Sequence, residues 1–142
     1  MDKMTSILGK GGFLLFTFGL ILGAAVPTFR NPRMGLSGHL TAVQTGIALI
    51  AFALFWQHFG VSRRFSGYLA YSLLLSSYAL VAGLILAAVF GTGKTLPIAG
   101  RGFSATNAQE LIVAIIVRVS SIWMFITCAA ISVCSFWKLD QD

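Results

Sequence analysis

The sequence has little charge for its length. Lysine and arginine number 10 and aspartate and glutamate only 4, so charged residues make up 10% of the 142 residues. Soluble domains typically have about 25% charged and roughly 45–50% apolar residues. Here the hydrophobic fraction is 57%. A soluble globule of this size has too little interior to hide so much apolar surface, and the composition therefore indicates a membrane protein.

Cysteine and proline are also scarce. The two cysteines, Cys128 and Cys134, lie inside the last apolar run, where a thiol behaves as a small apolar side chain. They imply neither a disulfide framework nor a thiolate metal site. Of the three prolines, Pro27 and Pro32 lie where the first apolar run ends, and Pro97 lies in the longest connection. Prolines therefore separate the apolar runs rather than interrupt them.

Long apolar runs dominate the rest of the chain. A membrane-spanning helix needs about 20 mostly apolar residues. Four runs have about this length: residues 11–27, 36–59, 66–90 and 108–137. Lys3 and Lys10 before the first run resemble a secretory signal, but that run leads into a second span, so we expect a retained helix. The sequence predicts one domain, residues 1–142, with an all-α fold: an integral membrane antiparallel four-helix bundle.

The basic residues are spread over both ends of this expected bundle, and the net charge is +6. One end has Lys3, Lys10, Arg63, Arg64 and Lys138, and the other has Arg30, Arg33, Lys94 and Arg101. A nucleic-acid surface gathers its charge on one face, so we expect no nucleic-acid partner and expect contacts with anionic membrane lipids. The positive-inside rule favours cytoplasmic termini by one charge, in a multi-pass protein of a bacterial inner membrane.

The longest connection, residues 91–102, is rich in turn-forming residues. Its Gly91–Lys94 segment hints at a phosphate loop, but it lacks the Walker spacing and no strand precedes it. Residues 104–107 offer caps for the last helix, with Glu110 near the favourable N-terminal end of the helix dipole.

Polar residues at membrane depth are costly and point to function. In the second run His39, Ala42 and Gly46 share one helical face. One interpretation is that His39 ligates a haem iron, with a flat recess beside it for the macrocycle. The other is that His39 forms a hydrogen bond across a helix contact, and that the small residues allow close approach. The pattern alone leaves both open.

Other polar residues have similar alternatives. Tyr78 in the third run is able to orient a polar substrate, although tyrosines in membrane helices are often anchors. Arg118 lies well inside the last run and suits a haem propionate or a substrate anion, a structural partner, or snorkelling. It lies about 12 Å along the helix from Glu110, too far for a direct pair. The Gly19–Gly23 pattern permits tight helix contact.

Three stretches resemble a known family. Residues 31–40, continuing to Gly46, residues 91–93 with 97–100, and Gln109-Glu110 are similar to bacterial hydroxylaminobenzene mutases, and more distantly to styrene oxide isomerase. The latter is a small four-helix membrane enzyme that forms a trimer and binds haem b through a histidine at the start of its second helix. The resemblance implies that His39 is the metal ligand of haem b and that the protein is a homotrimer.

The sequence departs from this family at substrate-positioning residues. Thr41 stands where the mutases have glutamate, and Thr45 stands where they have asparagine. In the third run Leu80 replaces an asparagine, and Leu84 aligns with the substrate tyrosine of styrene oxide isomerase. The ligand histidine is thus retained, while groups that would hold the substrate differ.

The resemblance predicts an isomerase that acts on a small aromatic or lipophilic hydroxylamine or epoxide. Iron bound to His39 would act as a Lewis acid, with Tyr78, Gln44 and Thr45 as the nearest hydrogen-bond donors to the substrate. Ala42, Gly46 and Arg118 would surround the cofactor. Two alternatives belong to other classes: a non-catalytic membrane haem protein acting as sensor or electron carrier, and a cofactor-free transporter or assembly subunit.

Overall fold

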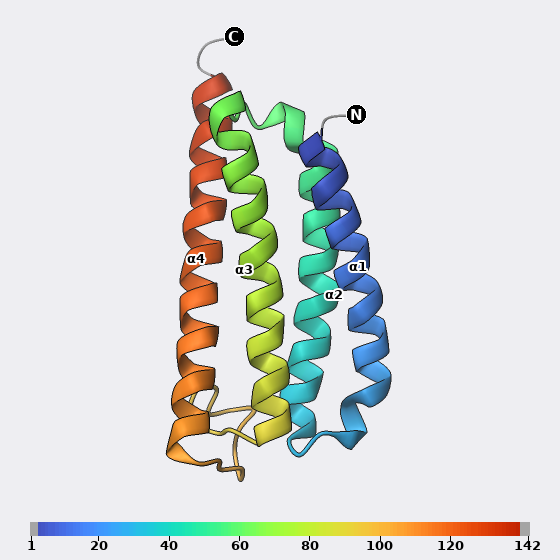
Figure 1. Ribbon diagram of the computed structural model, residues 1–142, viewed down its shortest axis with the longest axis vertical. Coiled ribbons are helices and arrows are strands. Elements are labelled where there is room, and N and C mark those ends of the chain that lie inside the picture. Colours follow the sequence, from blue (N-terminus) through green and yellow to red (C-terminus); the bar gives the residue numbers. More distant parts are fainter. Residues whose placement is uncertain (1–2, 140–142) are drawn as a thin grey trace.

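Four long helices with short connections make up the computed structural model, which describes residues 3–139 (Figure 1). Helix α1 spans Lys3–Ala25, α2 spans Pro32–Phe55, α3 spans Arg63–Phe90 and α4 spans Asn107–Leu139. Single turns of 3-10 helix, Val26–Thr28 and Trp56–His58, follow α1 and α2. Between residues 3 and 139 there is no strand, and the all-α fold expected from the sequence is confirmed.

All four helices are long and apolar enough to cross a membrane, with mean hydropathy between 1.6 and 2.4 in their most apolar parts. Large apolar side chains point outward from them: Leu54 is 71% exposed and Phe125 is 72% exposed. Such a surface is costly in water but suits hydrocarbon, where helices also satisfy their own backbone hydrogen bonds. The chain is therefore a multi-pass membrane protein.

Helix α1 begins at Lys3, earlier than the apolar run that starts at residue 11. Lys10 is exposed on this helix. Lysine is a good helix former, and its long side chain reaches the headgroup region while its stem stays on the apolar surface. The apolar run thus marks the part of α1 that lies in hydrocarbon, and the helix continues beyond it.

Local residues explain where α2 begins and α3 ends. The Asn31 side chain accepts hydrogen bonds from the backbone N–H groups of Arg33 and Met34, and Pro32 occupies the first helical turn, where its missing N–H costs nothing. Gly91 ends α3 with a left-handed backbone conformation (φ 69°), which glycine adopts without strain.

Glycines allow α1 and α2 to form the closest helix pair. A Cβ atom on Gly46 would lie 2.7 Å from the backbone nitrogen of Phe16, and one on Gly12 would lie 2.8 Å from the carbonyl oxygen of Gly46. Real side chains do not tolerate such distances, so both positions need glycine for the backbones to touch.

Hydrogen bonds between side chains join α3 to α4. The indole N–H of Trp123 donates to the hydroxyl oxygen of Ser72, and this hydroxyl lies 2.9 Å from the Thr127 hydroxyl. Interhelical hydrogen bonds in membranes contribute about 0.6 kcal/mol each on average. They also satisfy polar groups that hydrocarbon cannot hydrate.

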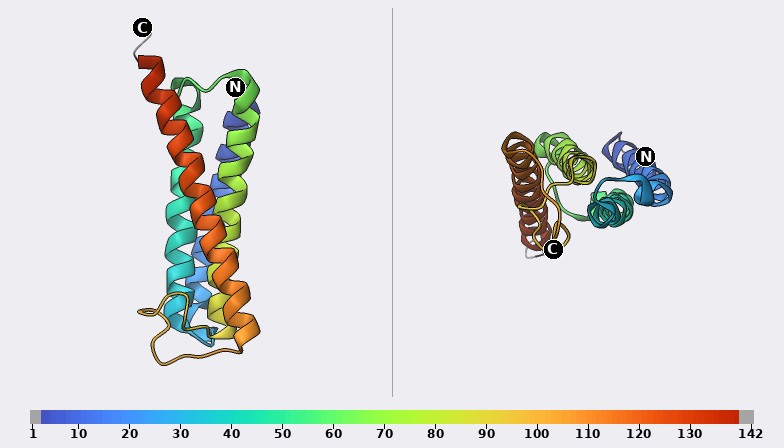
Figure 2. Two further views of the ribbon diagram at one scale, coloured as in Figure 1. Left: turned by 90° about the vertical axis from the view of Figure 1, so that its left-hand side faces the viewer. Right: turned by 90° about the horizontal axis from the view of Figure 1, so that it is seen from below.

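The helices follow one another in the order α4, α3, α2, α1 when the molecule is seen from below (Figure 2). Helix α2 packs against both α1 and α3, and α3 packs against α4, but α1 touches α3 far less than it touches α2. This arrangement leaves room for cavities between α1 and α3 and, on another side, between α2, α3 and α4.

Candidate functional site

His39 lies two turns into α2 and faces α1. Its Nδ1 atom is 2.7 Å from the carbonyl oxygen of Gly19. Because a carbonyl oxygen only accepts hydrogen bonds, Nδ1 is the donor, and the tautomer with its proton on Nδ1 has a free lone pair on Nε2. Histidines that bind metals usually donate their other ring N–H to a carbonyl or carboxylate in this way. The hydrogen bond therefore holds the half-buried ring against α1 and leaves Nε2 available as a ligand atom or a hydrogen-bond acceptor.

The absence of a side chain at Gly23 makes room for this ring. A Cβ atom on Gly23 would lie 2.8 Å from both Cε1 and Nδ1 of His39. The Gly19–Gly23 pattern permits a tight helix contact, as predicted, and it does two further things for His39. Gly19 supplies the hydrogen-bond acceptor, and Gly23 supplies the space.

Helix α1 fills the recess expected beside His39. Ala42 has no exposed surface, and a Cβ atom on Gly19 would lie 3.0 Å from the Ala42 Cβ atom. Gly46 is in backbone contact with α1 as well. A planar macrocycle cannot lie against Ala42 and Gly46 while α1 stays in place. For these two residues the packing supports the alternative interpretation, in which they allow close helix approach.

Gln44 and Thr45 line a cavity of about 260 Å³ between α2, α3 and α4, together with Ser77, Met124 and Cys128. The Thr45 hydroxyl donates to the Thr41 carbonyl oxygen at 2.6 Å, so only its oxygen remains available, as an acceptor. Within the described part of the chain, Gln44 makes no hydrogen bond to the protein. His39 does not line this cavity, because α2 turns by roughly 140° and 240° between His39 and these two residues.

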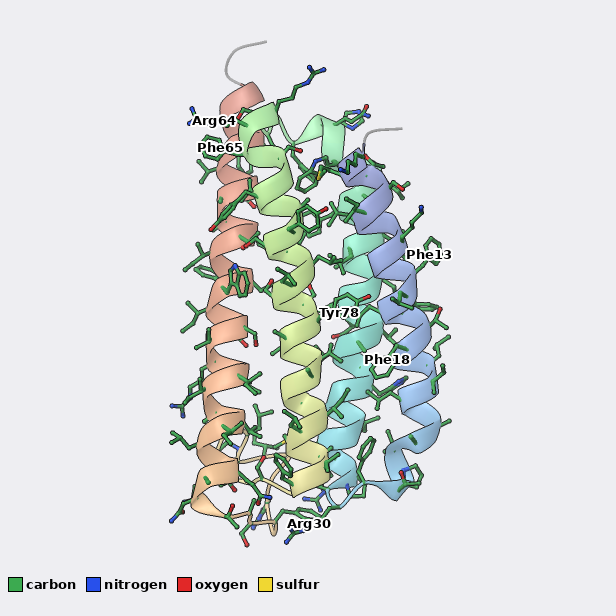
Figure 3. The ribbon with its side chains drawn as sticks, viewed as in Figure 1. Phe13, Phe18, Arg30, Arg64, Phe65 and Tyr78 are labelled. Carbon is green, nitrogen blue, oxygen red and sulfur yellow. The ribbon has the colours of Figure 1, made fainter. Side chains whose placement is uncertain are left out.

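Tyr78 lies in a different place, between α3 and α1 (Figure 3). Its hydroxyl donates to the carbonyl oxygen of Gly11 at 2.8 Å. It lines two adjoining cavities of about 380 and 560 Å³ that share no residue with the cavity containing Gln44 and Thr45. Within one chain, therefore, the predicted donors do not converge on one point.

Arg118 and Glu110 also lie apart, as their spacing along α4 predicted. Arg118 is exposed on the surface of the bundle. Glu110 is only 4% exposed, and its carboxylate accepts hydrogen bonds from the backbone N–H groups of Gly93 (2.8 Å) and Lys94 (3.0 Å). Glu110 thus fastens the α3–α4 connection to the first turn of α4.

The three stretches that carry the family resemblance meet at the end of the bundle where α2 begins, α3 ends and α4 begins. The Asn31 side-chain amide donates to the Ala99 carbonyl oxygen at 3.2 Å, while Glu110 holds Gly93 and Lys94. Asn31 begins the helix that carries His39, so the connection helps to position that histidine. The sequence did not assign these roles. The sequence showed only a set of polar residues among prolines and glycines. Their hydrogen-bond partners are backbone groups, which every residue has, so the sequence could not predict the pairing.

Comparison with known proteins identifies relatives that match most of the chain. The family model described as styrene oxide isomerase matches residues 4–136. Hydroxylaminobenzene mutase HabB of Ectopseudomonas oleovorans is 35% identical over 123 residues, which cover 83% of this chain and 73% of the relative. Hydroxylaminobenzene mutase HabA of the same organism is 35% identical over 111 residues, covering 78% of this chain and 82% of the relative.

Proposed function

This chain belongs to the styrene oxide isomerase family, and on that basis we propose that it rearranges a small lipophilic molecule inside the membrane. The protein is a membrane isomerase, since the matched family and the curated relatives are isomerases or mutases. The relatives are named for hydroxylaminobenzene and the family for styrene oxide. We propose an aromatic or lipophilic hydroxylamine or epoxide as substrate here, because such molecules partition into the hydrocarbon that surrounds the four helices.

His39 is the residue that would hold the cofactor, which we propose to be haem b. The hydrogen bond from Nδ1 to Gly19 and the space left by Gly23 support this assignment, because they fix the ring and leave Nε2 free. No group of three or more metal-binding side chains occurs among the described residues. A porphyrin brings its own four nitrogen donors, so one histidine suffices. When bound with an open position, haem iron supplies Lewis-acid chemistry that weakens a C–O or N–O bond without net redox change.

The cavity between α2, α3 and α4 is the best place for the aromatic part of a substrate. Its volume of about 260 Å³ exceeds the roughly 150 Å³ of an engineered cavity that binds benzene. The Gln44 amide offers donors and an acceptor there, and the Thr45 oxygen offers an acceptor. The Tyr78 hydroxyl would donate to a substrate only after breaking its hydrogen bond to the Gly11 carbonyl oxygen. We therefore assign Tyr78 the role of holding α1 to α3.

A homotrimer would bring these separate parts together. His39 and the cavity lie on different sides of α2 in one chain, so a neighbouring copy would complete the site. The exposed guanidinium of Arg118 lies on an outward surface, where it would meet an anionic group such as a haem propionate in that assembly. We place the protein in the bacterial inner membrane with cytoplasmic termini, following the slight excess of basic residues at that end.

An absorption spectrum of the purified, haem-supplied protein tests the cofactor. We expect a Soret band in the wild type that disappears in His39→Ala. His58→Ala is the matched control, because His58 is the second histidine, is exposed, and lies at the other end of α2. It should keep the band. A wild type without the band, or a His39→Ala variant that binds haem in full, would contradict the assignment.

The reaction is tested by giving the haem-loaded protein phenylhydroxylamine or styrene oxide. An isomerase forms a product of the same mass as the substrate, without added oxidant or reductant. We expect such a product from at least one of the two, and none from His39→Ala. Conversion by the variant at the wild-type rate would show that His39 has no part in the chemistry.

A further inference from the structure

A long apolar groove runs between α1 and α3, on a different side of the molecule from Gln44 and Thr45. Its two adjoining cavities, of about 380 and 560 Å³, share Leu14 and Tyr78. Phe18 lines one of the two cavities, beyond Tyr78 (Figure 3). Lys10 lines the other cavity. The groove exists because α1 packs closely on α2 and only slightly on α3.

The chemistry of the groove fits an anionic amphiphile. Its lining is apolar apart from Lys10, Tyr78 and backbone, and the Tyr78 hydroxyl is already bonded to Gly11. Among the residues that the structure describes, no acidic side chain lines either cavity. A ligand would therefore find hydrocarbon along the groove and one positive charge at its mouth. Helical side chains tilt toward the helix N-terminus, so the Lys10 ammonium reaches away from the groove toward the headgroup region.

The length of the groove is close to the depth of one leaflet of a bilayer. From Lys10 to Phe18 the helix rises by about 12 Å, at about 1.5 Å per residue. Half of a hydrocarbon core of roughly 30 Å is about 15 Å. Lys10 directly precedes the apolar run of residues 11–27, which places it at the boundary of the hydrocarbon. An acyl chain that starts at the headgroups would fill the groove to its inner end.

We propose that the groove between α1 and α3 binds one acyl chain of an anionic phospholipid, with the lipid phosphate at Lys10. This site is separate from the proposed isomerase site and does not depend on it. The bound chain fills the space that α1 and α3 leave between them on both sides of the Tyr78–Gly11 hydrogen bond.

Native mass spectrometry of the full-length protein tests the headgroup. The protein is given equal amounts of phosphatidylglycerol and phosphatidylcholine with identical acyl chains. We expect bound phosphatidylglycerol to exceed phosphatidylcholine, and the ratio to fall about fivefold in Lys10→Gln, the factor expected for one lysine at an anionic surface. Lys94→Gln is the matched control, because it removes one exposed lysine at the opposite end. An equal fall of this lipid ratio in Lys10→Gln and Lys94→Gln would overturn the proposal, since binding would then follow total charge alone.

A second pair of variants tests the groove itself. Ala82→Phe places a ring in the groove from its exposed position on α3, whereas Ala51→Phe places the same ring on an exposed position of α2 outside it. We expect Ala82→Phe to lose bound phospholipid of either headgroup and Ala51→Phe to retain it. Unchanged lipid in Ala82→Phe would overturn the proposal. A change in the number of copies per particle, with no change in bound lipid, would also overturn it, because a second copy would then be the occupant of the groove.

Discussion

At the scale of single residues, two glycines on α1 determine how one histidine on α2 is presented. Gly19 accepts the hydrogen bond that fixes the proton on Nδ1, and Gly23 leaves the space for the imidazole ring. Neither glycine needs to touch a metal. Both act by limiting where the Nε2 lone pair of His39 points, as outer-shell partners of metal ligands do.

Gly23→Ala should weaken haem binding without removing the ligand. The new Cβ atom would lie 2.8 Å from two ring atoms of His39, so the ring must rotate and its bond to Gly19 must lengthen. Loss of an outer-shell partner typically costs 10- to 100-fold in metal affinity, and we expect a loss of about 10-fold or more. Titration of the apoprotein with haem, followed at the Soret band, measures it.

Gly9→Ala is the control for helix propensity on the same helix. A Cβ atom at Gly9 would meet only the Ala53 Cβ atom at 3.7 Å, which is ordinary contact. Both variants gain roughly 0.5–1 kcal/mol in helix propensity. Only Gly23→Ala should change the haem affinity; if the two variants bind haem equally well, Gly23 does not position His39.

How much of the site the sequence predicts depends on what each residue contacts. His39 stands out because an ionisable group inside an apolar run needs a reason. Its acceptor, the Gly19 carbonyl, has no sequence signal, because every residue has a carbonyl. The face shared by His39, Ala42 and Gly46 suggested a recess, but small residues are as suitable for a neighbouring helix, and α1 occupies that space.

At the scale of secondary structure elements, the lengths of the apolar runs predict the four helices, because hydrocarbon allows little else. Cap residues predict several ends. Thr106 and Gln109 bond to each other at the start of α4 in a capping box. The grooves beside α3 were not predicted, since they depend on how far α1 and α4 stand from their neighbours.

Asn31 joins the start of α2 to the α3–α4 connection, and its substitution should loosen both. Asn31→Ala removes the cap acceptor for Arg33 and Met34 and the donor to Ala99. Loss of a cap typically costs about 0.5–2 kcal/mol, and loss of the partly buried hydrogen bond to Ala99 adds about 0.5–1.5 kcal/mol. We expect a lower midpoint of thermal unfolding in detergent.

Asn31→Asp separates the two contributions. The carboxylate still caps α2, but it cannot donate to the Ala99 carbonyl oxygen. We expect its midpoint to fall less than that of Asn31→Ala, and limited proteolysis to cut the connection near Ala99 more readily in both variants. An unfolding midpoint and cleavage rate equal to wild type in Asn31→Ala would contradict this role.

At the scale of the whole molecule, α4 has an outward apolar face with an arginine in it. Leu111, Ile122 and Phe125 are all more than half exposed on the same side as Arg118. Arg118 lies about 16 Å along α4 from Asn107, near the middle of a hydrocarbon core of roughly 30 Å. An arginine at that depth raises the free energy of membrane insertion by about 2.5–3.5 kcal/mol. A single copy in lipid offsets this cost only if the side chain finds a polar partner or snorkels.

The two possibilities predict opposite results for Arg118→Leu. If Arg118 serves the proposed homotrimer, its loss removes a contact between copies, and the trimer should dissociate at a lower detergent concentration. If it only snorkels, leucine is more favourable in hydrocarbon, and assembly should not change. Light scattering after size-exclusion chromatography measures the number of copies, with Lys94→Leu as a control outside the apolar face. Because the proposed homotrimer would join His39 to the proposed substrate cavity, we expect Arg118→Leu to lose assembly and isomerisation together. A monomeric wild type with full activity would refute the assembled site.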